Sequence, residues 1–114
     1  PAAQNLQWAV AHSKLPALKS LFTLRLARVL LAQDQAQQAL TALAGIPAGD
    51  YVALAAELRG DAQLKLGKPD AARKAYEEAM AKLDKDAPER NSVQMKLDNL
   101  TQLAAAPTGN KAAQ

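Results

Sequence analysis

Residues 57–80 read ELRGDAQLKLGKPDAARKAYEEAM and contain the small, apolar and turn-forming residues of a helical hairpin. The same pattern occurs earlier in the chain, within TLRLARVLLAQDQAQQALTAL at residues 23–43. Four pairs of matching residues keep one constant distance: Ala27 and Gly60, Asp34 and Gly67, Ala39 and Ala72, and Leu43 and Tyr76. Because the spacing does not slip between the first pair and the last, the chain contains an internal repeat of helical hairpins with a period of about 33 residues.

A helical repeat of this length is typical of tetratricopeptide arrays, in which each hairpin buries its apolar stripe only against its neighbours. Such hairpins need small residues where their two helices cross and a bulky residue where successive repeats meet. In the second hairpin Gly60 and Ala72 meet the first need, and Tyr76 meets the second. We therefore predict an all-α fold, with tetratricopeptide-like helical hairpin repeats in a right-handed α-solenoid of about six helices.

Apolar periodicity and turn residues divide the chain further. They predict helices at about residues 2–13, 16–33, 35–44, 51–66, 69–83 and 88–103. The repeat groups these helices into one tetratricopeptide-like domain, residues 1–104, followed by a disordered tail, residues 105–114. Within the domain we expect the second half of a truncated hairpin at 1–15, repeat one at 16–49, repeat two at 50–86 and a capping helix at 87–104. The chain begins at Pro1 without a methionine, so we expect a preceding excised segment that holds any membrane anchor.

Local signals refine this organisation. The helix over residues 16–33 is apolar nearly all round, which predicts a central helix covered on several sides. Gly45 suits a left-handed C-terminal cap, and Asp50 suits an N-cap whose carboxylate accepts free amide hydrogens of the first turn. Gly67 closes the helix that follows, and Pro69 opens the next one.

The charge distribution argues against nucleic acid. The formal net charge is +3, with the four basic residues Lys14, Lys19, Arg25 and Arg28 unopposed in the first third. The rest of the chain is balanced, and no long basic run with interleaved aromatic residues occurs. The chain also has no run of apolar residues long enough to cross a bilayer. These features predict a mildly basic end on a globular domain.

No group of residues has the spacing of a catalytic or metal site. The chain has no cysteine, and its one histidine, His12, stands near a helix end, where solvation is the expected state. Ser13 and Ser20 have no histidine–carboxylate relay in evidence. We therefore predict no enzyme, no cofactor and no metal. Trp8 is either a contact residue or a core residue beside the first apolar stripe, and the core is the more common outcome.

The register of the repeat identifies candidate partner-binding residues, because the first helix of each hairpin lines the concave groove in such arrays. Apolar side chains mixed with one cation and two carboxylates suit an extended peptide or a partner helix. Arg28 and Asp61 are the strongest candidates, since a charge on an apolar helix face requires a specific partner. The set is Leu21, Leu24, Arg28 and Leu31 in repeat one, and Leu54, Glu57, Asp61 and Leu64 in repeat two.

Two alternatives to partner binding remain open for these residues. Leu21 and Leu24 fit equally well as core side chains covered by the leading helix or by a missing hairpin. Arg28 can instead pair with Glu57 or Asp61 across neighbouring hairpins.

The sequence also carries a resemblance to one family. The markers are Leu24-Arg25-Leu26-Ala27-Arg28, Leu58-Arg59-Gly60-Asp61 and the closing Met95-Lys96-Leu97-Asp98-Asn99-Leu100. From about residue 24 to residue 100, the chain resembles the periplasmic domain of the YfgM-type ancillary subunits of the SecYEG translocon. That resemblance implies a non-enzymatic protein-interaction module on the periplasmic side of the bacterial inner membrane, anchored by an N-terminal helix absent from this chain.

The resemblance also implies the partners. They are the SecYEG translocon, a membrane-tethered parvulin-like chaperone and, in one form of the hypothesis, unfolded secreted chains that are handed over. No nucleic acid is implied. The alternative is a structural self-assembly domain, in which the apolar first hairpin packs against a second copy as a homo-oligomer without binding clients.

Overall fold

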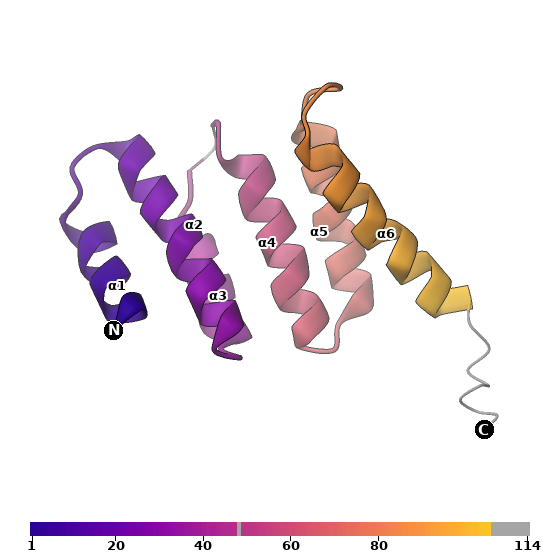
Figure 1. Ribbon diagram of the computed structural model, residues 1–114, viewed down its shortest axis with the longest axis horizontal. Coiled ribbons are helices and arrows are strands. Elements are labelled where there is room, and N and C mark those ends of the chain that lie inside the picture. Colours follow the sequence, from indigo (N-terminus) through magenta and orange to yellow (C-terminus); the bar gives the residue numbers. More distant parts are fainter. Residues whose placement is uncertain (48, 106–114) are drawn as a thin grey trace.

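The computed structural model describes residues 1–47 and 49–105, which form six α-helices and no strand (Figure 1). The helices are α1 (Ala2–His12), α2 (Pro16–Ala32), α3 (Ala36–Leu43), α4 (Val52–Lys65), α5 (Pro69–Lys82) and α6 (Glu89–Ala105). Their bounds lie close to the predicted ones, and the predicted all-α fold of about six helices is confirmed.

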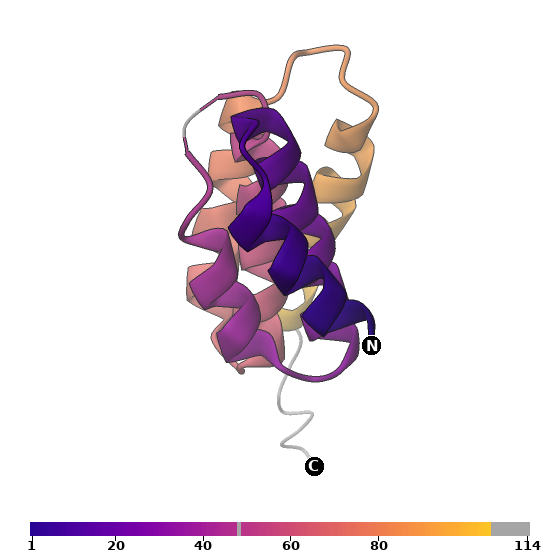
Figure 2. The same cartoon turned by 90° about the vertical axis from the view of Figure 1, so that its left-hand side faces the viewer.

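The helices form a row of antiparallel neighbours rather than a closed bundle. The hairpins α2–α3 and α4–α5 occupy the middle, with α1 beside α2 at one end and α6 beside α5 at the other (Figure 1). Seen from the α1 end, α3 and α5 lie on one side of the row and α6 on the opposite side (Figure 2). Helix α2 packs against α1, α3 and α4, so the predicted central position of this apolar helix is confirmed.

The small residues of the repeat lie in the core, where the helices pack closest together. Ala27, Ala39 and Ala72 are all fully buried, which lets the helices of each hairpin approach closely. At Gly60 the approach leaves no room for a side chain, because a Cβ atom there would lie 2.6 Å from Cδ1 of the Tyr76 ring. Tyr76 is 1% exposed, as expected of a bulky residue between neighbouring helices.

The turns also repeat. Asp34 and Gly67 stand one repeat apart, and both have a positive φ, of 60° and 75°. The left-handed backbone ends the first helix of each hairpin in the same way, with glycine in one repeat and aspartate in the other. The backbone therefore keeps the register that the sequence repeat predicts.

Helix α6 extends this register to a third position. Val93 follows Gly60 at the distance that separates Gly60 from Ala27, and it is fully buried against Tyr76 and Ala79 in the second core cluster. Arg90 fixes the start of α6 to the end of α5, since its Nη1 donates to the main-chain oxygens of Met80, at 3.0 Å, and Leu83, at 3.1 Å. These bonds satisfy carbonyl groups that the end of α5 leaves without helical partners.

Two predictions of helix caps are wrong. Helix α3 ends at Leu43 with Ala44 as a right-handed C-cap, and Gly45 has no positive φ, so it makes no left-handed cap. Tyr51, not Asp50, is the N-cap of α4, and no side chain caps it. The chain enters the helix through a main-chain turn in which the Val52 amide donates to the Gly49 oxygen. The predicted disordered tail, residues 105–114, is not tested: Ala105 is the last residue of α6, and residues 106–114 lie outside the described residues.

Candidate functional site

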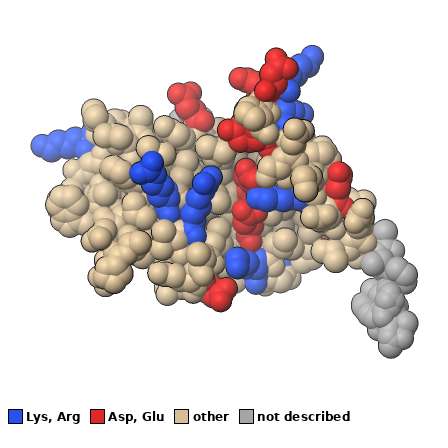
Figure 3. Space-filling view, in the orientation of Figure 1, with Lys and Arg blue, Asp and Glu red and all other residues tan. Residues whose placement is uncertain are grey.

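The first helices of the two hairpins, α2 and α4, form one face of the row together with α6, and this face is nearest the viewer in Figures 1 and 3. We call it the front face. A hollow of about 510 Å³ opens on it, where α2, α4 and α6 meet. Apolar and charged side chains line the hollow: Leu31, Ala32, Asp61, Leu64, Lys65 and Lys96. Three of the predicted partner-binding residues therefore meet at one place.

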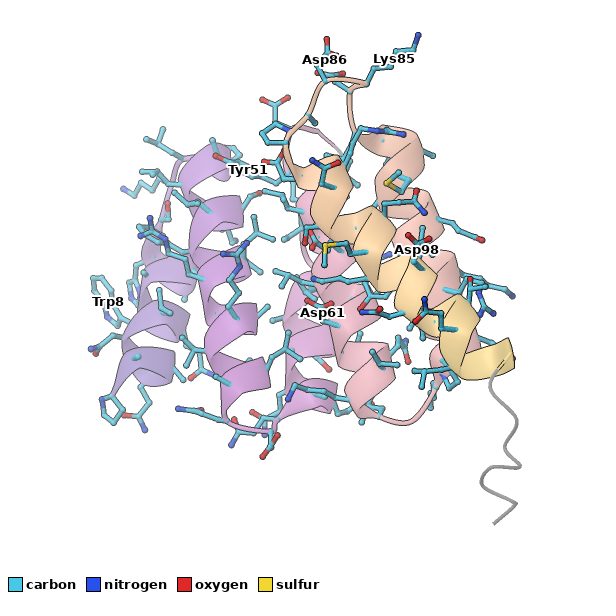
Figure 4. The ribbon with its side chains drawn as sticks, turned by 45° about the vertical axis from the view of Figure 1, so that its right-hand side comes forward. Trp8, Tyr51, Asp61, Lys85, Asp86 and Asp98 are labelled. Atoms are coloured by element: carbon cyan, nitrogen blue, oxygen red, sulfur yellow. The ribbon has the colours of Figure 1, made fainter. Side chains whose placement is uncertain are left out.

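The two carboxylates on the front face are held by α6. Glu57 and Asp61 stand one turn apart on α4, where like charges repel. The Lys96 ammonium donates to Glu57 Oε2 at 2.7 Å and to Asp61 Oδ2 at 3.1 Å. The Tyr76 hydroxyl donates to Asp61 Oδ1 at 2.6 Å, and Ser92 Oγ donates to Glu57 Oε2 at 3.3 Å. Figure 4 shows Asp61 pointing toward α6.

The electrostatics of this cluster favour a charged Lys96 and a neutral Tyr76. Burial by itself lowers the pKa of Lys96, but the hydrogen bonds and charges of Glu57 and Asp61 outweigh it and raise the pKa above its ordinary value of 10.5. Burial raises the pKa of the Tyr76 phenol, and the hydrogen bond to Asp61 and the charges of both carboxylates raise it further. The cluster is thus a cation shared by two carboxylates, with a neutral phenol beside it.

The cations of α2 have no such partner. Arg25 and Arg28 are exposed one turn apart, and Arg28 shares its side of α2 with Ala32, at the edge of the hollow. Within the described residues, neither guanidinium forms an ion pair or a hydrogen bond to a side chain. Figure 3 shows basic side chains over α2, beside acidic ones over α4. The predicted alternative that Arg28 pairs with Glu57 or Asp61 is wrong, because Lys96 already occupies both carboxylates.

The other predicted residues divide between surface and core. Leu64 is 41% exposed at the hollow, whereas Leu24 and Leu31 are 4% and 7% exposed and belong to the main core. Leu21 and Leu54 are half-buried, and Leu54 packs against that core. The core alternative therefore applies to Leu24, while Leu64 and Arg28 remain accessible to a partner.

Sequence reasoning missed Lys96 and assigned Tyr76 only a packing role. Two carboxylates one turn apart on an otherwise apolar helix face signal a nearby cation, and α6 carries only Arg90 and Lys96 as candidates. That signal could not choose between the two, because the choice depends on how α6 turns against α4. Trp8 is also not a core residue: it is 64% exposed and its ring stacks on that of His12, with centroids 4.2 Å apart (Figure 4).

No group of three or more His, Cys, Asp or Glu side chains in the described part of the chain is arranged to hold a metal ion. None of the helices described combines the length and the apolar character needed to cross a bilayer.

A row of helical hairpins with a charged, partly apolar face defines a helical-repeat scaffold of the α-solenoid class. A family model described as "Tetratricopeptide repeat-like domain" matches residues 1–102, and the chain belongs to this family.

Two curated relatives are more specific. The chain is 39% identical over 100 residues to the "Ancillary SecYEG translocon subunit" of Escherichia coli (strain K12), covering 88% of the chain and 48% of that protein. It is 34% identical over 99 residues to the protein of the same name from Neisseria gonorrhoeae (strain ATCC 700825 / FA 1090), covering 87% of the chain and 47% of that protein. These matches confirm the resemblance to YfgM-type subunits. The chain spans about half the length of these relatives. No solved structure matches it.

Proposed function

We propose that the chain is the protein-binding module of an ancillary translocon subunit and that it acts by docking, not by catalysis. The two relatives support the setting, since both are named ancillary subunits of the SecYEG translocon. The module works on the periplasmic side of the inner membrane. Its partners are the translocon and a membrane-tethered parvulin-like chaperone, and it assists the handover of secreted proteins.

The observation that carries this proposal is the pair of exposed cations on α2, Arg25 and Arg28, beside the front-face hollow. Lys96 pairs with both Glu57 and Asp61, so these carboxylates already have a partner, whereas Arg25 and Arg28 have none among the described residues. The exposed Leu64 and the wall formed by Leu31 add apolar surface. A cation beside an apolar hollow fits a partner segment that carries a carboxylate next to an apolar side chain. We therefore assign the docking role to Arg28 and Leu64, and the structural role to Glu57 and Asp61.

Reversing the charge of Arg28 tests the assignment. In the full-length protein, Arg28→Glu should lower the amount of translocon subunits that co-purify from detergent-solubilised inner membranes by about tenfold, as expected when a close charge contact becomes repulsive. Lys85→Glu is the matched control, because Lys85 lies at the tip of the α5–α6 loop, away from the front face (Figure 4). Equal recovery of the translocon with both variants would show that the front face does not dock it.

Self-assembly is the second candidate, and the two ends of the row favour it. At the α1 end Trp8 and Leu15 are 64% and 60% exposed, and on α6 Met95 and Leu103 are 64% and 66% exposed. Unlike apolar surfaces at opposite ends of a repeat can stack head to tail. Sedimentation equilibrium separates the two functions: a mass that rises with concentration, and that falls to the monomer with Trp8→Ser, supports assembly, whereas a constant mass of about 12.1 kDa excludes it.

A further inference from the structure

A second pocket lies behind α2, on the side away from the front-face hollow. It has a volume of about 650 Å³ and is formed where α1, the first half of α2 and the end of α3 come together. Its walls are mainly apolar, with Val10, Leu26, Ile46 and Pro47 among them. A concave apolar space of this size, with a few polar groups, has the usual features of a binding pocket. The proposed docking face uses none of its residues.

Two hydroxyl-bearing residues line this pocket. Ser20 and Thr23 line it although they are only 5% and 6% exposed. Thr23 Oγ1 donates to the Lys19 oxygen at 2.7 Å. The Ser20 hydroxyl has no hydrogen-bond partner among the described residues, although its residue is more than nine-tenths buried. Because Ser20 lines the pocket, its hydroxyl group is available to donate to or accept from a polar group of a ligand there.

Both charged side chains that line the pocket are cations, and the nearby carboxylate, Asp50, lines an adjoining hollow instead. Lys14 and Lys19 are exposed at the edge of the pocket, and neither forms an ion pair within the described residues. Residues 1–33 contain no aspartate or glutamate at all. The start of α2 lines the same pocket at Pro16, and no side chain caps that helix terminus, so its partial positive charge is also uncompensated.

We propose that this pocket binds an extended polypeptide segment in which apolar side chains are flanked by aspartate or glutamate. The apolar side chains enter between Val10 and Ile46, the backbone reaches the Ser20 hydroxyl, and the carboxylates meet Lys14 and Lys19. A flat lipid surface fits less well, because it cannot enter a concave pocket and offers nothing to the deep hydroxyl. The pocket is thus a second peptide site on the opposite side of α2 from the front face.

The test is a titration of the ¹⁵N-labelled 114-residue chain with the capped tetrapeptide acetyl-Asp-Leu-Leu-Asp-amide, followed by amide chemical shifts. The cross-peaks of Val10, Ser20 and Ile46 should shift saturably, with a Kd on the order of 1 mM. The peptide with asparagine in place of both aspartates should bind about tenfold more weakly, since it loses the charge contacts. The peptide with lysine at both positions should not bind.

Variants then locate the site. Ala11 is exposed on α1 and lines the pocket, so Ala11→Phe should block the mouth without disturbing the core, whereas Ala81→Phe on the exposed side of α5 should leave binding unchanged. Arg28→Glu should also leave it unchanged, which separates this site from the docking face. Binding that survives Ala11→Phe, or shifts confined to the front face, would overturn the proposal. So would a response of the pocket to phosphatidylglycerol vesicles but not to the peptide, which would assign it to lipid.

Discussion

Gly60→Ala should destabilise the domain by about 2 kcal/mol, although the same change in a helix interior ordinarily stabilises by up to about 1 kcal/mol. The added methyl group would overlap the Tyr76 ring. That ring is 1% exposed and its hydroxyl is bonded to Asp61, so it cannot swing aside without breaking the bond and exposing apolar surface. Urea unfolding followed by circular dichroism measures the change.

The first hairpin supplies the control for this prediction. It has Ala27 and Leu43 at the positions that Gly60 and Tyr76 occupy in the second hairpin. In the first hairpin the residue at the close approach is therefore larger, and the side chain that packs against it is smaller. The double variant Gly60→Ala/Tyr76→Leu should therefore lose at least about 1 kcal/mol less than the sum of the two single variants. A more stable Gly60→Ala single variant would show that Tyr76 is free to move and that the close approach is not a constraint.

Lys96→Met should destabilise the domain by about 2 kcal/mol, between the small value of an exposed ion pair and the large value of a buried one. The change keeps the aliphatic stem but leaves Glu57 and Asp61 facing each other without a cation, at side-chain exposures of 14% and 26%. Lys65→Met is the matched control, because Lys65 forms a solvent-exposed ion pair with Asp34. Loss of that pair should lower the free energy of unfolding by less than about 0.5 kcal/mol.

The pH dependence of unfolding gives this prediction a second readout. Folding raises the pKa values of both Lys96 and Tyr76 above their ordinary values of 10.5 and 10.0. As the pH rises, the unfolded chain therefore releases these protons before the folded chain does. The contribution of the two protonated groups to the free energy of unfolding is complete below about pH 10 and is lost as the pH rises further. In Lys96→Met the free energy of unfolding should fall less steeply at alkaline pH. An unchanged slope, together with a destabilisation no larger than that of Lys65→Met, would show that the cluster does not hold α6 in place.

The repeat made the fold predictable. Its constant spacing specifies where small residues must lie, and Gly60, Ala72 and Tyr76 occupy those places because helix packing allows little else there. Helix capping was less predictable, because several residues can satisfy the same helix end. Asp50 has a favourable side chain for an N-cap, yet the chain enters α4 through Tyr51 with a main-chain turn from Gly49.

The site was predicted only in part, and for a physical reason. Helical register places Arg28, Asp61 and Leu64 on one face, and the structure brings the last two together at the hollow. Register cannot show which charges neutralise one another, because that depends on long side chains from α6. Asp61 therefore seemed to be a docking residue, whereas Lys96 and Tyr76 make it part of the scaffold.

Site-specific photo-crosslinking from the hollow tests the docking role most directly. A benzoylphenylalanine at Ala32, which is exposed and lines the hollow, leaves Arg28 intact. In inner membranes carrying the full-length protein, this probe should crosslink to a SecYEG subunit or to a tethered chaperone, and Arg28→Glu should abolish the crosslink. A probe at Ala81 on α5 should give none. Crosslinks from Ala32 only to a second copy of the chain, or equal crosslinks from both probes, would contradict docking through the front face.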